Sequence, residues 1–508
     1  MEEYRTVPTV CPYCGTGCGM LLEVSQGRIT GVLPLKGHPV SRGALCLKGW
    51  SCWEFVESPR RLTRPMVRSG DTMAGTSWDE AITLVAGRLK ETVEEHGPDA
   101  AAFVSSARCT NEENYLMSKL ARAVAGTNNI DHCARLCHSP TVAGLAATFG
   151  SGAMTNSIGE LAGAEVILLV GSNTTEQHPI IAGRIMEALR GGARLVILDP
   201  RAIQLSPFAT LHLRHRPGSD VACLNAMMKV ILDEDLYHRE FVMGRTQGFE
   251  EFRASLEACT PEWAAGISGL EADDIREAAR IIGGAGKASI VYCMGITQHV
   301  SGTDNVKALA NLAMLTGNLG RLSTGVNPLR GQNNVQGACD MGALPNVLTG
   351  YQKVEEGGAA GKFEAAWGAG IPRQPGLTLT AIMEAAREGR VRFLYVMGEN
   401  PAVSDPNSSR VLEALREVEF LVVQDIMETE TGEHADVLLP GACWAEKEGT
   451  FTSTERRVQR LRLAVEPPGD ARPDWRVICD IARACGASGF DYSSPEEVFT
   501  EMAGLTPA

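Results

Sequence analysis

A strand–turn–helix–strand pattern occurs twice in the sequence and restricts the fold more than any other feature. Residues 166–170 are an apolar run that ends at Gly171, and residues 195–198 are a second run that ends at Asp199. Residues 393–397 and 420–424 repeat the pattern between Gly398 and Asp425, and the two glycine-to-acid spacings differ by one residue. Apolar runs of strand length around a helical segment are typical of a parallel βαβ crossover. The chain is therefore predicted to be an α/β protein with Rossmann-like units.

Each predicted unit has a glycine where its first strand ends and an acid where its second strand ends. A phosphate fits such a turn, and the carboxylates of Asp199 and Asp425 can accept hydrogen bonds from a ribose or a guanine edge. Neither unit contains Gly-x-Gly-x-x-Gly, which argues against an ordinary dinucleotide cofactor. Two units in near register predict a pseudo-twofold pair of nucleotide sites. A further strand at 288–295 predicts another α/β unit.

The first fifty residues contain Cys11-x2-Cys14-x3-Cys18 and a fourth cysteine, Cys46. Three closely spaced thiolates can surround a small inorganic cluster, and the fourth would complete a four-cysteine iron–sulfur site. Structural zinc is the alternative, although it more often uses two separated Cys-x2-Cys knuckles. Lys48 follows two residues after Cys46 and is either a surface charge or a contact beside the cluster.

A thiol and an imidazole are adjacent at Cys137-His138. Thiolates are soft ligands for heavy metals, and histidine transfers protons readily near neutral pH. The structural alternative is a buried core cysteine followed by a histidine at a helix end.

Two arginines lie in segments that suit ligand contacts. Arg330 and Gln332 lie in a glycine- and amide-rich loop at 325–337, where a guanidinium could clamp a carboxylate. Arg108 lies where a predicted strand meets a helix, a common place for ligand contacts in α/β folds. A surface arginine and a loop arginine are the respective alternatives.

Size and charge exclude some classes of protein. A chain of 508 residues is too long for one core, and its net charge of -14 argues against nucleic acid as a partner. No apolar run approaches membrane-spanning length, which argues against membrane insertion, and the N-terminus shows no leader pattern, so we expect cytoplasmic residence. Fifteen cysteines then indicate metal or redox chemistry.

Three further segments carry local predictions. Residues 79–95 have helical periodicity, with Ser77 as the expected cap. The glycine-rich residues 351–376 are expected to be a surface insertion. Residues 474–484 are expected to form a helix followed by a short tail.

Taken together, these motifs resemble the molybdopterin oxidoreductases, and within them the catalytic (alpha) subunits of metal-dependent formate dehydrogenases with a cysteine ligand. The resemblance covers nearly the whole chain. It rests on the N-terminal cysteine motif with Lys48, the 129–140 segment, Gly171-Ser-Asn, the 330–342 segment, Gly398-Glu-Asn-Pro401 and Val423-Gln-Asp425. It implies reversible oxidation of formate to carbon dioxide at molybdenum or tungsten.

The resemblance assigns a role to each motif. Cys137 takes the place of the metal ligand, His138 that of the proton acceptor, Arg330 that of the formate-orienting cation and Lys48 that of the lysine between a pterin and the cluster. Cys11, Cys14, Cys18 and Cys46 would hold one 4Fe-4S cluster. The implied contacts to the bis-molybdopterin guanine dinucleotide are Arg108, Gly171, Ser172, Asn173, Asp199, Gln332, Gly398, Glu399, Asn400 and Asp425.

The expected domains follow from these assignments. Residues 1–56 would form a β-rich cluster domain. Residues 57–130 and 333–440 would be two parts of one α/β domain, with the second part binding one pterin, and residues 131–332 would bind the other. Residues 441–508 would return towards the cluster and pterin region. From the resemblance we also expect this chain to lack the family's β-barrel-like C-terminal cap domain.

The resemblance also implies partners and leaves alternatives. An electron-accepting subunit carrying a flavin or an iron–sulfur cluster is expected, and another chain could supply the cap domain. The enzymatic alternative is the catalytic subunit of formylmethanofuran dehydrogenase. The non-enzymatic alternative is an electron-transfer subunit that has lost its metal.

Overall fold

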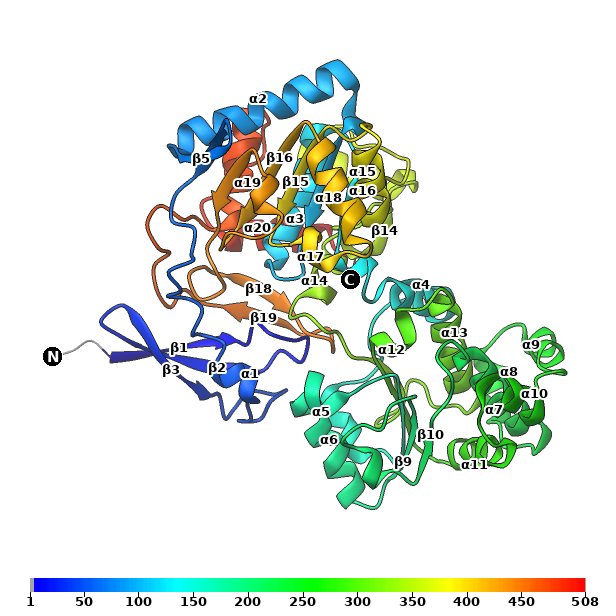
Figure 1. The fold of residues 1–508 in the computed structure, drawn as a ribbon. Helices are drawn as coiled ribbons and strands as arrows, with labels where there is room; N and C mark the ends of the chain where they lie inside the picture. The colour runs from blue at the N-terminus through cyan, green and yellow to red at the C-terminus, as the bar shows by residue number, and fades with distance from the viewer. Residues whose placement is uncertain (1–3, 508) are drawn as a thin grey trace.

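The computed structural model describes residues 4–507, so Met1–Glu3 and Ala508, the ends of the first and last predicted segments, lie outside it. The chain begins with a three-stranded antiparallel sheet in the order β1-β2-β3 (Figure 1). Its strands are β1 (Tyr4–Val10), β2 (Gly19–Ser25) and β3 (Arg28–Pro34). Cys11, Cys14 and Cys18 lie in the loop between β1 and β2, and Cys46 precedes the short helix α1 (Leu47–Trp50). The N-terminal region is therefore β-rich, as predicted.

A seven-stranded sheet combines two distant parts of the chain in the order β5-β4-β17-β16-β15-β6-β7. Its strands are β4 (Met66–Ser69), β5 (Thr72–Gly75), β6 (Ala101–Ser105), β7 (Ile130–His132), β15 (Phe393–Met397), β16 (Phe420–Asp425) and β17 (Val437–Pro440). The strands from β17 to β7 pair in parallel, and β4 and β5 add an antiparallel edge.

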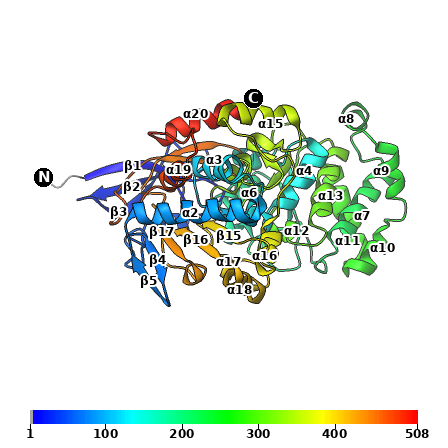
Figure 2. The ribbon, with the colours of Figure 1, turned by 90° about the horizontal axis from the view of Figure 1, so that it is seen from above.

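Successive side chains along these strands point to opposite faces of the sheet, and both faces are buried. Phe103 and Tyr395 pack against α2 (Trp78–His96), α3 (Asn111–Lys119), α19 (Asp474–Ala484) and α20 (Pro495–Leu505). Val104 and Val396 face the opposite side, with α16 (Leu379–Arg387) and α18 (Ser408–Glu417). Figure 2 shows the two groups of helices on either side of the strands. Helix α2 begins with the predicted Ser77, in a capping box with Glu80.

The middle of the chain forms a five-stranded parallel sheet in the order β10-β9-β8-β11-β12. Its strands are β8 (Val166–Val170), β9 (Arg194–Leu198), β10 (Leu211–Leu213), β11 (Ala288–Tyr292) and β12 (Gly325–Pro328). One face packs on α6 (Pro179–Arg190). The other packs on α7 (Asp220–Asp233), α11 (Ala272–Gly283) and α13 (Gly302–Leu315), and α4 (Ser139–Phe149) lies against α13.

The two predicted crossovers are β8–α6–β9 and β15–α18–β16, and each lies in a different sheet. Both first strands end at a glycine with positive φ, 53° at Gly171 and 63° at Gly398. A Cβ at Gly171 would lie 2.6 Å from the carbonyl carbon of Gly295, so the turns after β8 and β11 approach too closely for a side chain. The α/β prediction is confirmed.

Two C-terminal predictions were incomplete. The expected surface insertion contains α15 (Gly357–Trp367), and its Phe363 and Trp367 are buried. Trp367 donates a 2.7 Å hydrogen bond to Tyr115, so the glycine-rich composition concealed a helix that belongs to the core. The expected tail contains α20, which begins after the capping residue Ser494.

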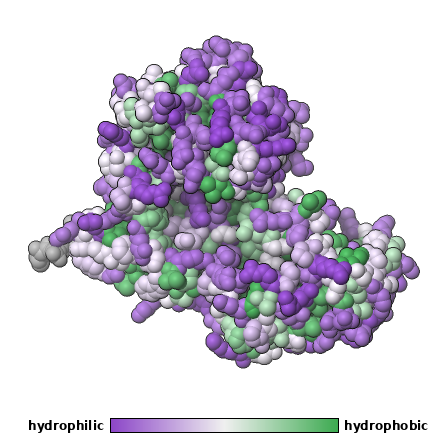
Figure 3. Space-filling view, in the orientation of Figure 1, coloured by the Kyte–Doolittle hydropathy of each residue, from purple (hydrophilic) through white to green (hydrophobic). Residues whose placement is uncertain are grey.

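Part of the chain between α15 and α20 returns to the N-terminal sheet. The hairpin of β18 (Gly449–Thr452) and β19 (Val458–Leu461) packs beside β1, and Trp444 donates a 2.8 Å hydrogen bond to the carbonyl of Val10. The surface in Figure 3 is hollowed where the seven-stranded part meets the other two. None of the helices within residues 4–507 combines the length and apolarity needed to cross a membrane.

Candidate active site and cofactor cavities

The four predicted cluster ligands line one small cavity. Cys11, Cys14, Cys18 and Cys46 surround it with Gly49, Pro179 and Ile180. A 2.8 Å hydrogen bond from the amide of Cys11 to the carbonyl of Cys18 closes the loop that carries three of them. Burial raises the pKa of the Cys14 and Cys18 thiols, so thiolates there need a cationic partner. Four convergent thiols in a low-dielectric pocket therefore fit an iron–sulfur cluster.

The cluster loop also contacts the predicted anion-binding segment. The amide of Gly15 donates a 3.1 Å hydrogen bond to the carbonyl of Arg330. A Cβ at Gly15 would lie 2.6 Å from that carbonyl oxygen, so only glycine allows this approach. Thr454 joins both segments, because its amide donates to Gly15 and its hydroxyl accepts from the amide of Arg330.

Arg330 lies in the loop between β12 and α14 (Val335–Asp340), and its side chain is 1 % exposed. Its Nε and Nη2 donate to Oε1 of Gln336 at 3.2 and 3.1 Å, and Nη2 also donates to the carbonyl of Gly152 at 2.9 Å. Nη1 makes a long 3.5 Å contact with the carbonyl of His138. Among the described residues no Asp or Glu forms an ion pair with this guanidinium. It is thus a buried cation without a direct ion-pair partner in the described chain.

Cys137 and His138 lie beside this cation. Burial raises the pKa of Cys137 to about 12, and the charge of Arg330 opposes that shift. A bound metal cation would favour the thiolate in the same way. The sulfur of Cys137 lies 3.3 Å from the sulfur of Met294.

His138 is fully buried and lies 3.1 Å from the hydroxyl of Thr141 through Nδ1. Its Nε2 has no partner in the described chain. Burial, and secondarily the charge of Arg330, holds the pKa of His138 well below its ordinary value, so the imidazole is neutral. A neutral ring that donates from Nδ1 keeps the lone pair of Nε2 for a proton.

The first crossover opens onto a cavity of about 390 Å³, here called the β8 cavity. Four predicted contacts line it, namely Gly171, Ser172, Asn173 and Asp199. The sequence prediction missed several other lining residues, including Arg201, His215, Asp220, Met294, Gly295 and His299. Oδ1 of Asp220 is 3.0 Å from His215, while its buried Oδ2 has no partner within the described residues. This free carboxylate oxygen suits a nucleobase N–H donor.

The second crossover opens onto a cavity of about 440 Å³, the β15 cavity. Its lining includes the predicted Arg108, Gly398 and Asp425, together with Gln424, Cys443, Trp444, Lys447 and Asp474. Arg108 donates to the carbonyls of Pro12 and Tyr13 at 2.9 and 2.8 Å, which ties the cluster loop to this cavity. Burial raises the pKa of Asp425 to about 7.

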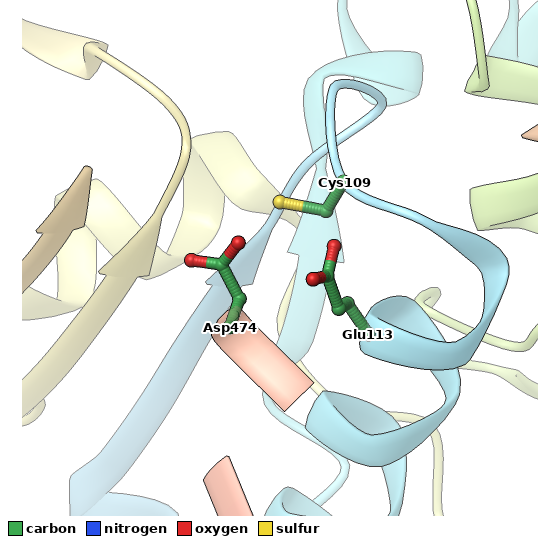
Figure 4. Close-up of side chains that lie close together, drawn as sticks. All are labelled: Cys109, Glu113 and Asp474. Carbon is green, nitrogen blue, oxygen red and sulfur yellow. The ribbon is translucent and has the colours of Figure 1, made fainter. Parts of the chain in front are cut away.

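Cys109, Glu113 and Asp474 converge beside the β15 cavity (Figure 4), with ligand atoms within 4.8 Å of one another. The ammonium of Lys447 donates to Glu113 at 2.9 Å and to Asp474 at 2.6 Å. Because this buried lysine already supplies the positive charge, the group fits a cavity wall better than a metal site.

The remaining predicted contacts lie between these features. Gln332 accepts a 2.6 Å contact from the thiol of Cys133. Glu399 is the next residue after Gly398, and its Oε1 is buried without a partner within residues 4–507. Asn400 joins the turn after β15 to Glu430 and Thr431 through hydrogen bonds.

Lys48 spans two of the sites. Its ammonium donates to the carbonyls of Glu176 and Gln177 at 2.7 and 3.1 Å. Gln177 lines the β8 cavity, and Cys46, two residues before Lys48, lines the cluster cavity. Lys48 therefore connects the wall of one cavity to the edge of the other.

Comparison with known proteins places this geometry in a family. The model of the molybdopterin oxidoreductase family matches residues 61–484, and that of the molybdopterin oxidoreductase Fe4S4 domain matches residues 4–58. The computed structure is also similar to acetylene hydratase from Pelobacter acetylenicus, with a TM-score of 0.83 and 21 % identity, over 98 % of this chain and 72 % of that one. At that identity the structural similarity supports the fold alone.

Two relatives share much more sequence with this chain. The F420-dependent formate dehydrogenase subunit alpha of Methanocaldococcus jannaschii is 51 % identical over 99 % of this chain and 74 % of its own length. Formate dehydrogenase H of Escherichia coli is 44 % identical over 99 % of this chain and 71 % of its own length. With four convergent thiols, two crossover cavities and these matches, the chain belongs to the molybdopterin oxidoreductase family.

Proposed function

We propose that this chain is the catalytic subunit of a formate dehydrogenase, which oxidises formate reversibly to carbon dioxide, a proton and two electrons. The observation that carries the proposal is the buried guanidinium of Arg330, which has no ion-pair partner in the described chain and contacts His138 beside Cys137. A buried charge without an ion-pair partner costs folding free energy unless a ligand supplies the opposite charge. A small carboxylate is the ligand that fits an arginine fork.

The β8 and β15 cavities are the proposed sites of two molybdopterin guanine dinucleotides, and Cys137 is the proposed protein ligand of the metal. When bound, molybdenum or tungsten supplies a two-electron acceptor, and the 4Fe-4S cluster passes electrons on singly. Gly171, Asp199 and Asp220 line the first cavity and offer a phosphate turn and carboxylate acceptors. In the second cavity, Arg108 offers a positive charge for a phosphate, and Asp425 offers a carboxylate acceptor.

The residues around Cys137 perform the protein's part of the chemistry. Arg330 holds formate by its oxygens, with Nη1 as the end of the fork that is least engaged by the protein. His138 accepts the proton released from formate at Nε2, which is buried and has no partner in the described chain. Close packing around the pair excludes water and strengthens both interactions.

Electron exit defines the proposed partners. Lys48 links the wall of the β8 cavity to the edge of the cluster cavity, and a second redox subunit would accept electrons from the cluster. The M. jannaschii relative carries F420 dependence in its name, and we propose a flavin or iron–sulfur subunit for this chain as well. Cytoplasmic residence stays a prediction.

Formate-dependent dye reduction by the anaerobically purified holoenzyme tests the proposal. Cys137→Ala should abolish this activity while the iron–sulfur absorbance remains, because the thiol lies outside the cluster cavity. Cys485→Ala is the matched control, since Cys485 is a half-buried thiol at the end of α19 that contacts the carbonyl of Ala86 in α2 and lines none of the three cavities described above. A wild-type enzyme with full metal and pterin content that did not oxidise formate would contradict the proposal.

A further inference from the structure

The contacts of Arg330 are unusual for a buried cation, because all of its protein acceptors are neutral. Carbonyls of Gly152 and His138 and the amide oxygen of Gln336 receive its side-chain donors. Gln336 accepts from both Nε and Nη2, and so it fixes the plane of the guanidinium. Gln336 is 1 % exposed, so its side chain has no alternative partner in solvent.

The amide of Gln336 is itself oriented by a second residue. Its Nε2 donates to Oδ1 of Asp340 at 2.7 Å and to the hydroxyl of Tyr351 at 3.2 Å. Gln336 and Asp340 are four residues apart on α14, which places both side chains on one face. An amide whose nitrogen faces the acid must turn its oxygen towards Arg330.

We propose that Gln336 is a positioning residue for the anionic substrate, and that Asp340 is its anchor. This pair holds the guanidinium of Arg330 in place without a direct ion pair, so that more of its positive charge is available to formate. The inference rests on the proposed function and adds to it the device that selects for an anion.

The electrostatic effect on Arg330 depends on whether position 336 or position 340 carries the carboxylate. A carboxylate at position 336 would form an ion pair with Nε and Nη2 of Arg330 and would compete with the substrate for the same charge. At position 340 the carboxylate is one side chain further from the guanidinium, with the Gln336 amide between them. Coulomb attraction falls with distance, so the charge of Arg330 is less compensated in this order.

Exchanging the two groups tests the proposal. The double variant Gln336→Glu/Asp340→Asn keeps one amide and one carboxylate but moves the negative charge next to Arg330. We expect the KM for formate to rise by about 10- to 100-fold, with kcat changed by less than about threefold. The dissociation constant of nitrate, a planar anion without a C–H bond, should rise by the same factor when it is measured by calorimetry on the holoenzyme.

Gln247→Glu is the matched control, because it adds one carboxylate at an exposed position between α8 (Arg239–Arg245) and α9 (Phe249–Ser255). Its KM and nitrate affinity should stay within about threefold of the wild type. Gln336→Glu alone should change both constants in the same direction as the exchange, so the test does not depend on the folding of the double variant.

Wild-type KM and nitrate affinity in the exchanged variant, or in Gln336→Glu, would overturn the inference. An equal loss in Gln247→Glu would also overturn it, since the position of the added charge would then be irrelevant. These results differ from a failure of the proposed function, in which the metal-loaded wild type itself would not oxidise formate.

Discussion

Two buried arginines of this protein have no carboxylate partner in the described chain, yet their surroundings differ. Arg122 donates from Nε to Asn128 and from its two terminal nitrogens to Ser118 and to the carbonyls of Gly342, Leu344 and Val347. These acceptors use all five N–H donors of the guanidinium. Arg330 engages Nη1 only through one long contact of 3.5 Å.

The comparison separates a structural arginine from a ligand-binding one. Arg122 lies in the helical turn Leu120–Ala125 that follows α3 and joins it to residues 342–347, and burial lowers its pKa to about 9. Because its donors are complete, it offers nothing to a substrate. Arg330 has the same burial but keeps part of its fork free beside Cys137 and His138. Burial of charge alone therefore does not identify a binding site, whereas an incomplete set of hydrogen bonds does.

The largest effect on stability should follow from Arg122→Met. The substitution leaves buried carbonyl and amide acceptors of the 342–347 loop and Asn128 without donors, and each such group costs free energy. We expect the free energy of unfolding to fall by about 4 kcal/mol, measured by urea denaturation. The exposed Arg410→Met is the control and should change it by less than about 0.5 kcal/mol. A loss of similar size in both variants would remove the distinction.

A smaller effect should appear near Arg330 as a dependence on pH. Burial raises the pKa of Asp340 to about 6, so the folded protein keeps a proton that the unfolded chain loses near pH 4. The protonated Asp340 side chain therefore stabilises the fold at low pH, and this stabilisation is lost as the pH rises from about 4 to about 6. Asp340→Asn should remove this loss. The free energy of unfolding of the variant should then exceed that of the wild type by on the order of 1–2 kcal/mol at pH 7.5, but not at pH 4.5. A constant difference at both pH values would contradict the assignment.

Local patterns predicted much of the framework. Spacing and periodicity predicted the crossovers β8–α6–β9 and β15–α18–β16, the helix cap at Ser77 and the convergence of Cys46 with the earlier cysteine motif. These features depend on residues within one supersecondary unit or on a distinctive ligand set, and such signals survive in the sequence.

Features that depend on topology were missed. Gly295 lines the β8 cavity because β11 pairs beside β8, and the order of strands in a sheet is not visible in the sequence. Lys447 and Asp474 reach the β15 cavity from the C-terminal segment for the same reason. The link from Arg330 through Gln336 to Asp340 needed side-chain orientation, since three polar residues in a loop and a short helix carry no periodic pattern.

The central claim is that Arg330 binds the substrate anion, and kcat/KM for formate in Arg330→Met, normalised to measured metal and iron content, tests it most directly. The account predicts a loss on the order of a thousandfold, because the missing charge serves the substrate, and a loss of stability smaller than that of Arg122→Met, because fewer buried acceptors lose their donors. A kcat/KM within a few-fold of the wild type at equal metal content would contradict it.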